Sequence, residues 1–272
     1  MVDEKMMQFT ITLLLMFFGA YGAAYIPFAW DVSDKQINII SSLGGGLMIG
    51  SCLAVVIPEG FASFSGHHDH HDSDVGEIPE GFAGIALVVG FLGMYLLDQM
   101  QADHPHGCCA HRKSGDEEEK VPQRRPEKAI TGLLIHCIAD GVAMGSAFLS
   151  GNSSVTLILG TAMVLHKAPM AFGLSSFLIS SGWTWERSAS TLLLFSSMAP
   201  AATVVTYIVL QILPLFGGEQ SIALAILFSG GTFLHAATMH ILPEVTIGRN
   251  LDLLFLSIGA LAPPLLSWGH SH

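Results

Sequence analysis

Apolar runs of about twenty residues recur along the whole chain, and they limit its possible folds more than any other feature. An α-helix of this length can cross a hydrocarbon core of roughly 30 Å. Eight runs can be counted, at about 6–28, 36–58, 82–101, 129–149, 154–181, 189–213, 221–244 and 251–268. No soluble domain fits between them. The sequence therefore predicts a single all-α polytopic membrane domain over residues 1–272, with eight transmembrane helices.

The composition agrees with a membrane protein, because 51% of the residues are hydrophobic and only 12% are charged. The first run follows the head MVDEKMMQ and has a long apolar core without a clear cleavage site, so we interpret it as the first span rather than a signal peptide. The net charge of −11 lies largely in loops and does not indicate nucleic acid as a partner. Cys52 and Cys137 fall inside spans, and the cysteine spacing is not typical of a disulfide framework.

The basic residues predict the orientation, since cytosolic loops are enriched in lysine and arginine. Nine of them fall in the loops after the first, third, fifth and seventh spans, and only Lys5 falls on the other side. We therefore expect both termini in the extracellular space or an organelle lumen. The loop at about 102–128 is then cytosolic.

Two segments repeat a pattern. GGLMIGSCLAVVIPE and GGTFLHAATMHILPE each place a glycine pair twelve residues before a Pro-Glu, from Gly46 to Pro58 and from Gly231 to Pro243. The two segments cross the membrane in opposite directions. The pattern predicts an inverted repeat of helices 1–3 and 6–8 flanking helices 4 and 5, which is typical of transporters. Coincidence is the alternative interpretation.

Polar residues inside the fourth and fifth runs are the candidate functional residues. His136 and Asp140 are one helical turn apart, and His166 and Met170 have the same spacing in the fifth run. At about 1.5 Å of rise per residue, His136, Asp140 and His166 fall near one depth in the membrane. Two imidazoles and a carboxylate suit a divalent transition metal such as zinc. A buried His–Asp hydrogen bond joining the two helices explains the spacing equally well.

The segments HCIADG and HKAPMAFG resemble the paired signatures of the ZIP (Zrt/Irt-like) transporters, and other phrases resemble the Golgi-type branch of that family. The resemblance covers the whole chain. It implies transport of Zn²⁺ into the cytosol, with Zn²⁺ as cargo and no organic cofactor. It also implies a homodimer in the bilayer of the Golgi or trans-Golgi network, with the plasma membrane as a second location.

The resemblance also implies a ligand set and a movement. The primary metal would be held by His136, Asp140, His166 and Met170, with Met170 at best a weak ligand. Helices 1, 4, 5 and 6 would move against helices 2, 3, 7 and 8. Many family members hold a second metal beside the first, but here Cys137 and Lys167 occupy two of its positions. A protonated lysine cannot bind a metal, so we expect one metal, with Lys167 balancing the charge of Asp140.

Further polar residues suggest how a metal ion would arrive and leave. The outer tract HHDHHDSD at 67–74 and Glu59 could attract cations, although a solvated loop explains the tract as well. On the cytosolic side we expect a release path lined by Asp98, His104, His106, His240 and Glu244. For His235 we expect a structural role.

Two other functions use the same residues. An intramembrane metal-dependent hydrolase would use zinc to polarise a water, with Asp140 as base. The chain lacks the H-E-x-x-H pattern of many such enzymes, and its repeat favours transport. A metal-gated receptor that signals through its cytosolic loop is the third possibility.

Overall fold

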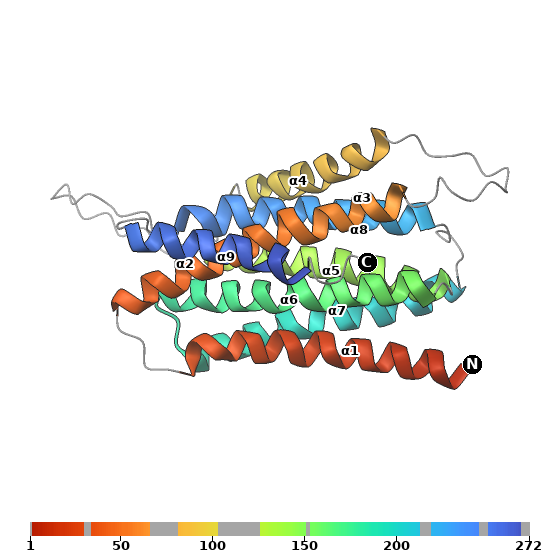
Figure 1. Cartoon of the computed structure of the whole chain (residues 1–272), viewed down its shortest axis with the longest axis horizontal. Coiled ribbons are helices and arrows are strands. Elements are labelled where there is room, and N and C mark those ends of the chain that lie inside the picture. The colour runs from red at the N-terminus through yellow and green to blue at the C-terminus, as the bar shows by residue number, and fades with distance from the viewer. Residues whose placement is uncertain are drawn as a thin grey trace.

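The computed structural model describes residues 2–29, 34–65, 81–102, 126–150, 153–212, 219–244 and 250–267. Within these ranges the backbone forms helices and turns and no strand. Long helices run side by side along the longest axis of the molecule (Figure 1). The all-α fold that the sequence predicts is therefore confirmed.

The helices follow the predicted runs. Three runs are composite, because a short 3₁₀ or π segment continues the helix. In chain order the elements are α1 (Val2–Tyr25) with η1 (Ile26–Phe28); α2 (Asp34–Ser51), η2 (Cys52–Val56) and α3 (Ile57–Ser65); α4 (Gly81–Ala102); α5 (Pro126–Ser150); α6 (Ser153–Ser180); α7 (Trp185–Ile212); α8 (Glu219–His235), η3 (Ala236–Ile241) and η4 (Leu242–Glu244); and α9 (Asn250–Ser267).

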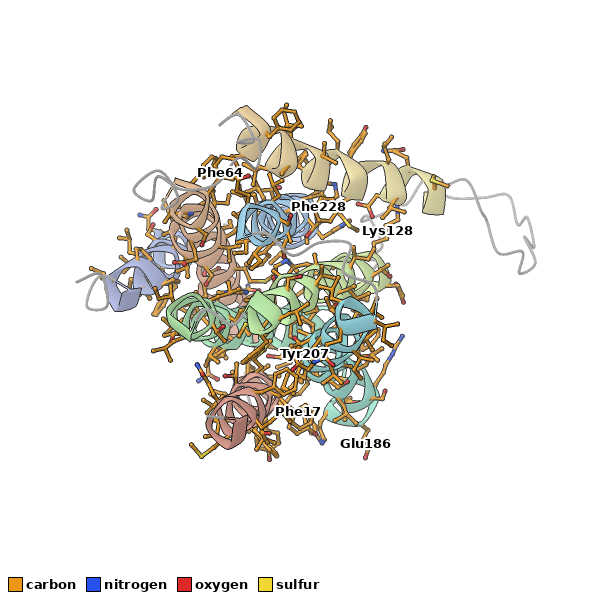
Figure 2. The ribbon with its side chains drawn as sticks, turned by 90° about the vertical axis from the view of Figure 1, so that its right-hand side faces the viewer. Phe17, Phe64, Lys128, Glu186, Tyr207 and Phe228 are labelled. Carbon is orange, nitrogen blue, oxygen red and sulfur yellow. The ribbon has the colours of Figure 1, made fainter. Side chains whose placement is uncertain are left out.

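Seven of the described helical passes are long and apolar enough to cross a membrane, and an eighth apolar helix, Asn250–Leu265, is shorter. Large apolar side chains point outward from the peripheral helices. On α4, for example, Leu96 is 60% exposed and Met100 is 64% exposed. Figure 2 shows α4 at the edge of the bundle. A surface of this kind suits a hydrocarbon environment, where exposed apolar groups cost nothing.

The bundle has two layers. Helices α1, α5, α6 and α7 pack on one another in one layer, and α2, α3, α4, α8 and α9 pack in the other (Figure 1). The layers meet mainly where α2 packs on α6 and where α5 packs on α8. These two groups correspond to the two sets of helices that the resemblance implies would move against each other.

The inverted repeat is visible in the packing. Helix α2 pairs with α9 in the way that α8 pairs with α4, and α6 packs on α1 and α2 in the way that α5 packs on α7 and α8. Each contact has a counterpart in the other half of the bundle. The counterpart is found by replacing the first, second and third passes by the sixth, seventh and eighth, and α5 by α6. The inverted repeat thus organises the whole bundle.

Matching glycines form close helix contacts in both halves of this repeat. Gly46 on α2 and Gly259 on α9 each face the backbone of the other helix, and Gly231 on α8 and Gly90 on α4 do the same. An added Cβ at any of these positions would overlap a facing carbonyl group, at Leu256, Leu43, Leu87 and Phe228 respectively. Gly46 and Gly231 are equivalent in the repeat, so close backbone packing at a glycine joins both helix pairs.

Matching π-helical turns precede the two repeated prolines. In η2 the N–H of Ile57 donates to the carbonyl of Cys52, and in η3 the N–H of Leu242 donates to the carbonyl of Ala237. These two bonds are at equivalent positions of the repeat. A proline has no N–H to donate to a carbonyl group of the preceding turn. A wider π-turn before the proline changes which backbone groups are paired there.

We expect Gly231→Ala to destabilise the α4–α8 pair, because the new Cβ would force the Leu87 backbone away. The typical cost of overpacking is about 1–3 kcal/mol. The measurement is the thermal unfolding midpoint of the purified protein in detergent. Gly93→Ala on α4 is the control, since its Cβ would meet nothing within 4 Å. Equal midpoints for both variants would contradict this account of the packing.

Candidate metal site

The carboxylate of Asp140 is the centre of a buried polar cluster. His136 and Asp140 lie on one face of α5, and His136 Nε2 is 3.4 Å from Asp140 Oδ2. From α6, His166 Nε2 is 3.2 Å from the same oxygen. Lys167 Nζ is 2.9 Å from it as well. The structure therefore brings together three of the four ligands predicted from the sequence, along with the predicted charge-balancing lysine.

The spacing of these atoms fits a metal. In a tetrahedral zinc site with metal–ligand distances of about 2.0–2.1 Å, neighbouring ligand atoms lie about 3.3 Å apart. The two imidazole nitrogens are 3.4 Å and 3.2 Å from Asp140 Oδ2. Across the described residues, His136, Asp140 and His166 form one of two groups of side chains that could hold a metal ion. A small movement of Lys167 would open the shared oxygen to an ion.

Hydrogen bonds at the far side of each ring orient both histidines. His136 Nδ1 is 3.0 Å from the backbone oxygen of Ser229, and His166 Nδ1 is 2.8 Å from that of Ala162. Carbonyl oxygens only accept, so these contacts suit the tautomer with the proton on Nδ1, which leaves the lone pair of Nε2 for a metal ion. Without an ion, His166 Nε2 is within hydrogen-bond distance of Asp140 Oδ2. His136 Nε2 is buried and has no hydrogen-bond partner among the described residues.

Helix α8 contributes two residues that sequence reasoning missed. The Ser229 hydroxyl donates to Asp140 Oδ1 at 2.6 Å, and its oxygen is 2.9 Å from His136 Nδ1. The ring of Phe233, one turn later, stacks on His136 with centroids 4.6 Å apart. Ser229 directly precedes the glycine pair of the repeat, but the sequence has no signal that α8 packs against α5 at this level.

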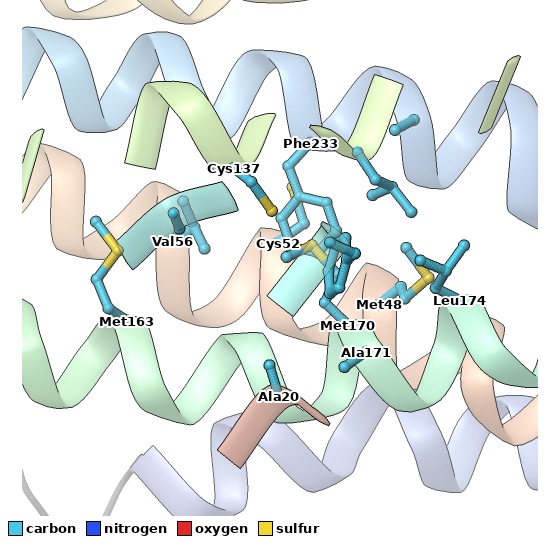
Figure 3. Packing of buried hydrophobic residues seen from close by; sticks show 14 of the residues in the cluster. Ala20, Met48, Cys52, Val56, Cys137, Met163, Met170, Ala171, Leu174 and Phe233 are labelled. Atoms are coloured by element: carbon cyan, nitrogen blue, oxygen red, sulfur yellow. The ribbon is translucent and has the colours of Figure 1, made fainter. Parts of the chain in front are cut away.

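Met170, the fourth predicted ligand, lies in the apolar core. It is fully buried in a cluster that also contains Met48, Cys52 and Leu174 (Figure 3). It is one turn along α6 from His166. Its part in metal binding stays a prediction.

A second polar group lies between α4 and α8. His240 Nε2 is 2.7 Å from Asp98 Oδ2, and His235 Nε2 is 3.7 Å from the same oxygen. The structure thus brings together Asp98 and His240 of the predicted release path. It adds His235, for which the sequence suggested only a structural role. Lys128 on α5 reaches this end of α4, where its Nζ is 3.4 Å from the backbone oxygen of Asp98 (Figure 2).

Several predicted residues cannot be placed. His104, His106 and the outer tract at 67–74 lie outside the described residues, as does the side chain of Glu244. Glu59 lies in α3, at the opposite end of the second pass from its start at Asp34.

The comparisons with known sequences all point to the same family. The sequence model of the family described as "ZIP Zinc transporter" matches residues 2–130 and 101–266. "Zinc transporter ZIP9" of Xenopus tropicalis is 34% identical, over 95% of this chain and 96% of the frog protein. "Zinc transporter ZIP1" of Danio rerio is 23% identical, over 92% of each chain.

We expect Ser229→Ala to weaken zinc binding by about 10- to 100-fold, the usual effect of removing a hydrogen bond that orients a ligand. The measurement is the Zn²⁺ dissociation constant of the purified protein. Ser175→Ala is the matched control, because this buried hydroxyl donates to Phe172 O within its own helix. Equal affinities in the two variants would mean that α8 does not orient the ligands.

Proposed function

The chain belongs to the ZIP zinc transporter family and transports zinc, and from this premise we propose that it moves Zn²⁺ into the cytosol through a mononuclear site. The proposed ligands are His136, Asp140 and His166, with Met170 as a soft fourth ligand. The proposed transport domain comprises residues 1–272, with the loop at about 102–128 on the cytosolic side.

The observation that carries the site is the convergence of two imidazole nitrogens on Asp140 Oδ2 at the spacing of zinc ligands. A charged group inside a membrane costs several kcal/mol unless it is paired, so such a cluster is rarely without function. The histidines come from α5 and α6 and are oriented by backbone carbonyl groups. An arriving ion would exchange its waters for these atoms.

The proposed site holds one metal because of Lys167. Its ammonium group is 2.9 Å from Asp140 Oδ2 and is also 3.6 Å from the thiol of Cys137. In the absence of an ion it pairs with the buried carboxylate. When an ion binds, the ammonium group yields the oxygen and remains as a positive charge where a second cation would otherwise lie.

The proposed direction rests on the distribution of basic residues and on the second polar group. Nine of the 11 lysines and arginines fall in the loops, or in the helix ends beside them, that we assign to the cytosol. The ion would enter past Glu59 and leave along a release path formed by Asp98, His104, His106, His240 and Glu244. No nucleotide-binding motif occurs in the sequence, so the concentration difference of zinc would drive the movement.

The proposed location is the Golgi or trans-Golgi network, with the plasma membrane as a second location and both termini luminal or extracellular. The proposed assembly is a homodimer. Both proposals derive from the resemblance of the whole chain to the Golgi-type branch. The hydrolase interpretation is set aside, since the family consists of transporters rather than enzymes.

We expect proteoliposomes with the purified chain to take up Zn²⁺, and His136→Ala and Asp140→Ala to abolish the uptake. Each substitution removes a ligand atom of the proposed site. Met144→Leu, a buried change elsewhere in α5, is the control and should transport normally. Equal uptake in all variants would overturn the site. Zinc binding without any uptake by the wild-type protein would favour the receptor interpretation.

We expect Lys167→Gln to bind Zn²⁺ at least about tenfold more tightly, a gain of ~1.4 kcal/mol, because the ion no longer competes with an ammonium group for Asp140 Oδ2. Calorimetric titration of the purified protein measures this affinity. Arg187→Gln removes a positive charge near the start of α7, where the guanidinium group lies over the ring of Trp183, and is the control. Weaker binding in Lys167→Gln would show that the lysine supports the site rather than competing with the ion.

A further inference from the structure

A groove with apolar walls lies between α5 and α8 at the surface of the bundle, and its volume is about 240 Å³. Figure 2 labels one of its residues, Phe228 on α8. Among the described residues, the groove is lined by Ile135, Ile138, Ala139 and Val142 from α5 and by Ala225 and Phe228 from α8. All six side chains are hydrocarbon, whereas a bound water needs several polar partners. The groove therefore suits an apolar occupant.

The packing of the neighbouring helices explains why a groove forms here. Helix α8 packs on both α4 and α5, and α5 packs on both α8 and α7. At each outer pair a glycine meets the backbone of the partner helix. An added Cβ at Gly231 would overlap the carbonyl oxygen of Leu87 on α4, and one at Gly141 would crowd that of Ala199 on α7. The outer pairs are therefore closely packed.

The central pair, α5 and α8, is joined through side chains. Inside the bundle, the buried hydroxyl of Ser229 on α8 donates to Asp140 on α5. At the surface, the groove is lined in part by the small side chains of Ala139 and Ala225, which leave the space between the two helices unfilled. The groove and the polar cluster thus belong to the same pair of helices.

The groove opens toward the hydrocarbon of the membrane. Ile138 is 44% exposed and Val142 is 39% exposed, so both continue the apolar outer surface of the bundle. Helix α5 runs from Pro126 to Ser150, which places Ile138 at its middle. The distance along the helix is about 18 Å to either end. The groove therefore lies near the middle of the bilayer, where the terminal parts of acyl chains are found.

The size of the groove favours a flexible chain over a compact molecule. Sites for drug-sized molecules usually have volumes of about 300–1,000 Å³ and enclose most of the ligand. This groove is smaller and open to the membrane, so it suits a stretch of acyl chain whose remainder stays among the lipids. Lipid tails are as apolar as the groove, so close packing against its walls is what holds the chain there.

We propose that the groove binds the terminal part of an acyl chain of a membrane lipid. The acyl chain contacts α5 and α8, and thus both layers of the bundle, next to the helix pair that the bond from Ser229 to Asp140 joins. The lipid supports the packing of the two helices beside the polar cluster. This proposal rests on the membrane location of the protein and is independent of the proposed metal ligands.

The test is photo-cross-linking of the purified full-length protein in nanodiscs of phosphatidylcholine that carries a diazirine near the end of one acyl chain. Mass spectrometry of the peptides identifies the labelled residues. Leu14 on α1 and Leu92 on α4 are the references, since each is 50% exposed near the middle of its helix. Ordinary surrounding lipid would label Ile138 and Val142 no more than these references, because their exposed fractions are lower.

We expect Ile138 and Val142 to be labelled in excess of both references. The excess should be lost when the diazirine lies next to the ester group of the lipid, because that part of the acyl chain does not reach the middle of the bilayer. This comparison of two probes uses the wild-type protein and depends on no variant. Labelling at the level of the references would overturn the site. Light scattering then shows whether a second copy of the protein covers the groove.

Variants that fill the groove test the same proposal. Ala225→Leu adds bulk from α8 and should remove the excess labelling of Ile138. Val142→Phe does so from α5. Ala201→Leu, the same change as the first at an exposed position of α7, is the matched control and should keep the excess. Size-exclusion chromatography checks that each variant is folded. Excess labelling that persists in both folded groove variants would overturn the site.

Discussion

A carboxylate buried at membrane depth is the constraint that organises this bundle. Asp140 is 1% exposed, and every group around it compensates for that burial. Lys167 supplies a positive charge, Ser229 donates a hydrogen bond, and two imidazoles face the remaining oxygen. Removing one partner of such a cluster is usually costly, since it leaves a buried charge without compensation. Three helices, α5, α6 and α8, are therefore held in register by a single side chain.

The two layers meet at this cluster. The proposed metal ligands belong to α5 and α6, whereas the serine and the stacked phenylalanine belong to α8. Contacts within each layer include glycines that bring α2 onto α9 and α8 onto α4. The interface between the layers has a contact of this kind as well, because Gly44 on α2 faces Gly173 on α6. The polar cluster around Asp140 is therefore the part of this interface that distinguishes it from the packing within a layer.

The sequence predicted much of the fold and the grouping of polar side chains around Asp140. Length and apolarity define the spans, and the spacing of His136, Asp140 and His166 predicts a common depth. The contacts of Ser229 and the grouping of His235 with His240 were not predicted, for physical reasons. A serine in an apolar helix is common, and only the packing of α8 on α5 gives its hydroxyl a partner. The grouping of His235 with His240 requires a π-turn, whereas helical periodicity at 3.6 residues per turn places them on different faces.

The inverted repeat makes the two halves of the bundle similar in backbone but different in chemistry. A frame with true two-fold symmetry would offer an ion the same chemical surroundings at either end of the bundle. Here the frame is nearly symmetric in its glycines, prolines and π-turns, but Gly50 and Val55 stand where the other half has His235 and His240. The backbones of the two halves are thus nearly equivalent, and side chains at a few positions make the two halves chemically different. The chemical difference between the two ends of the path therefore comes from these side chains.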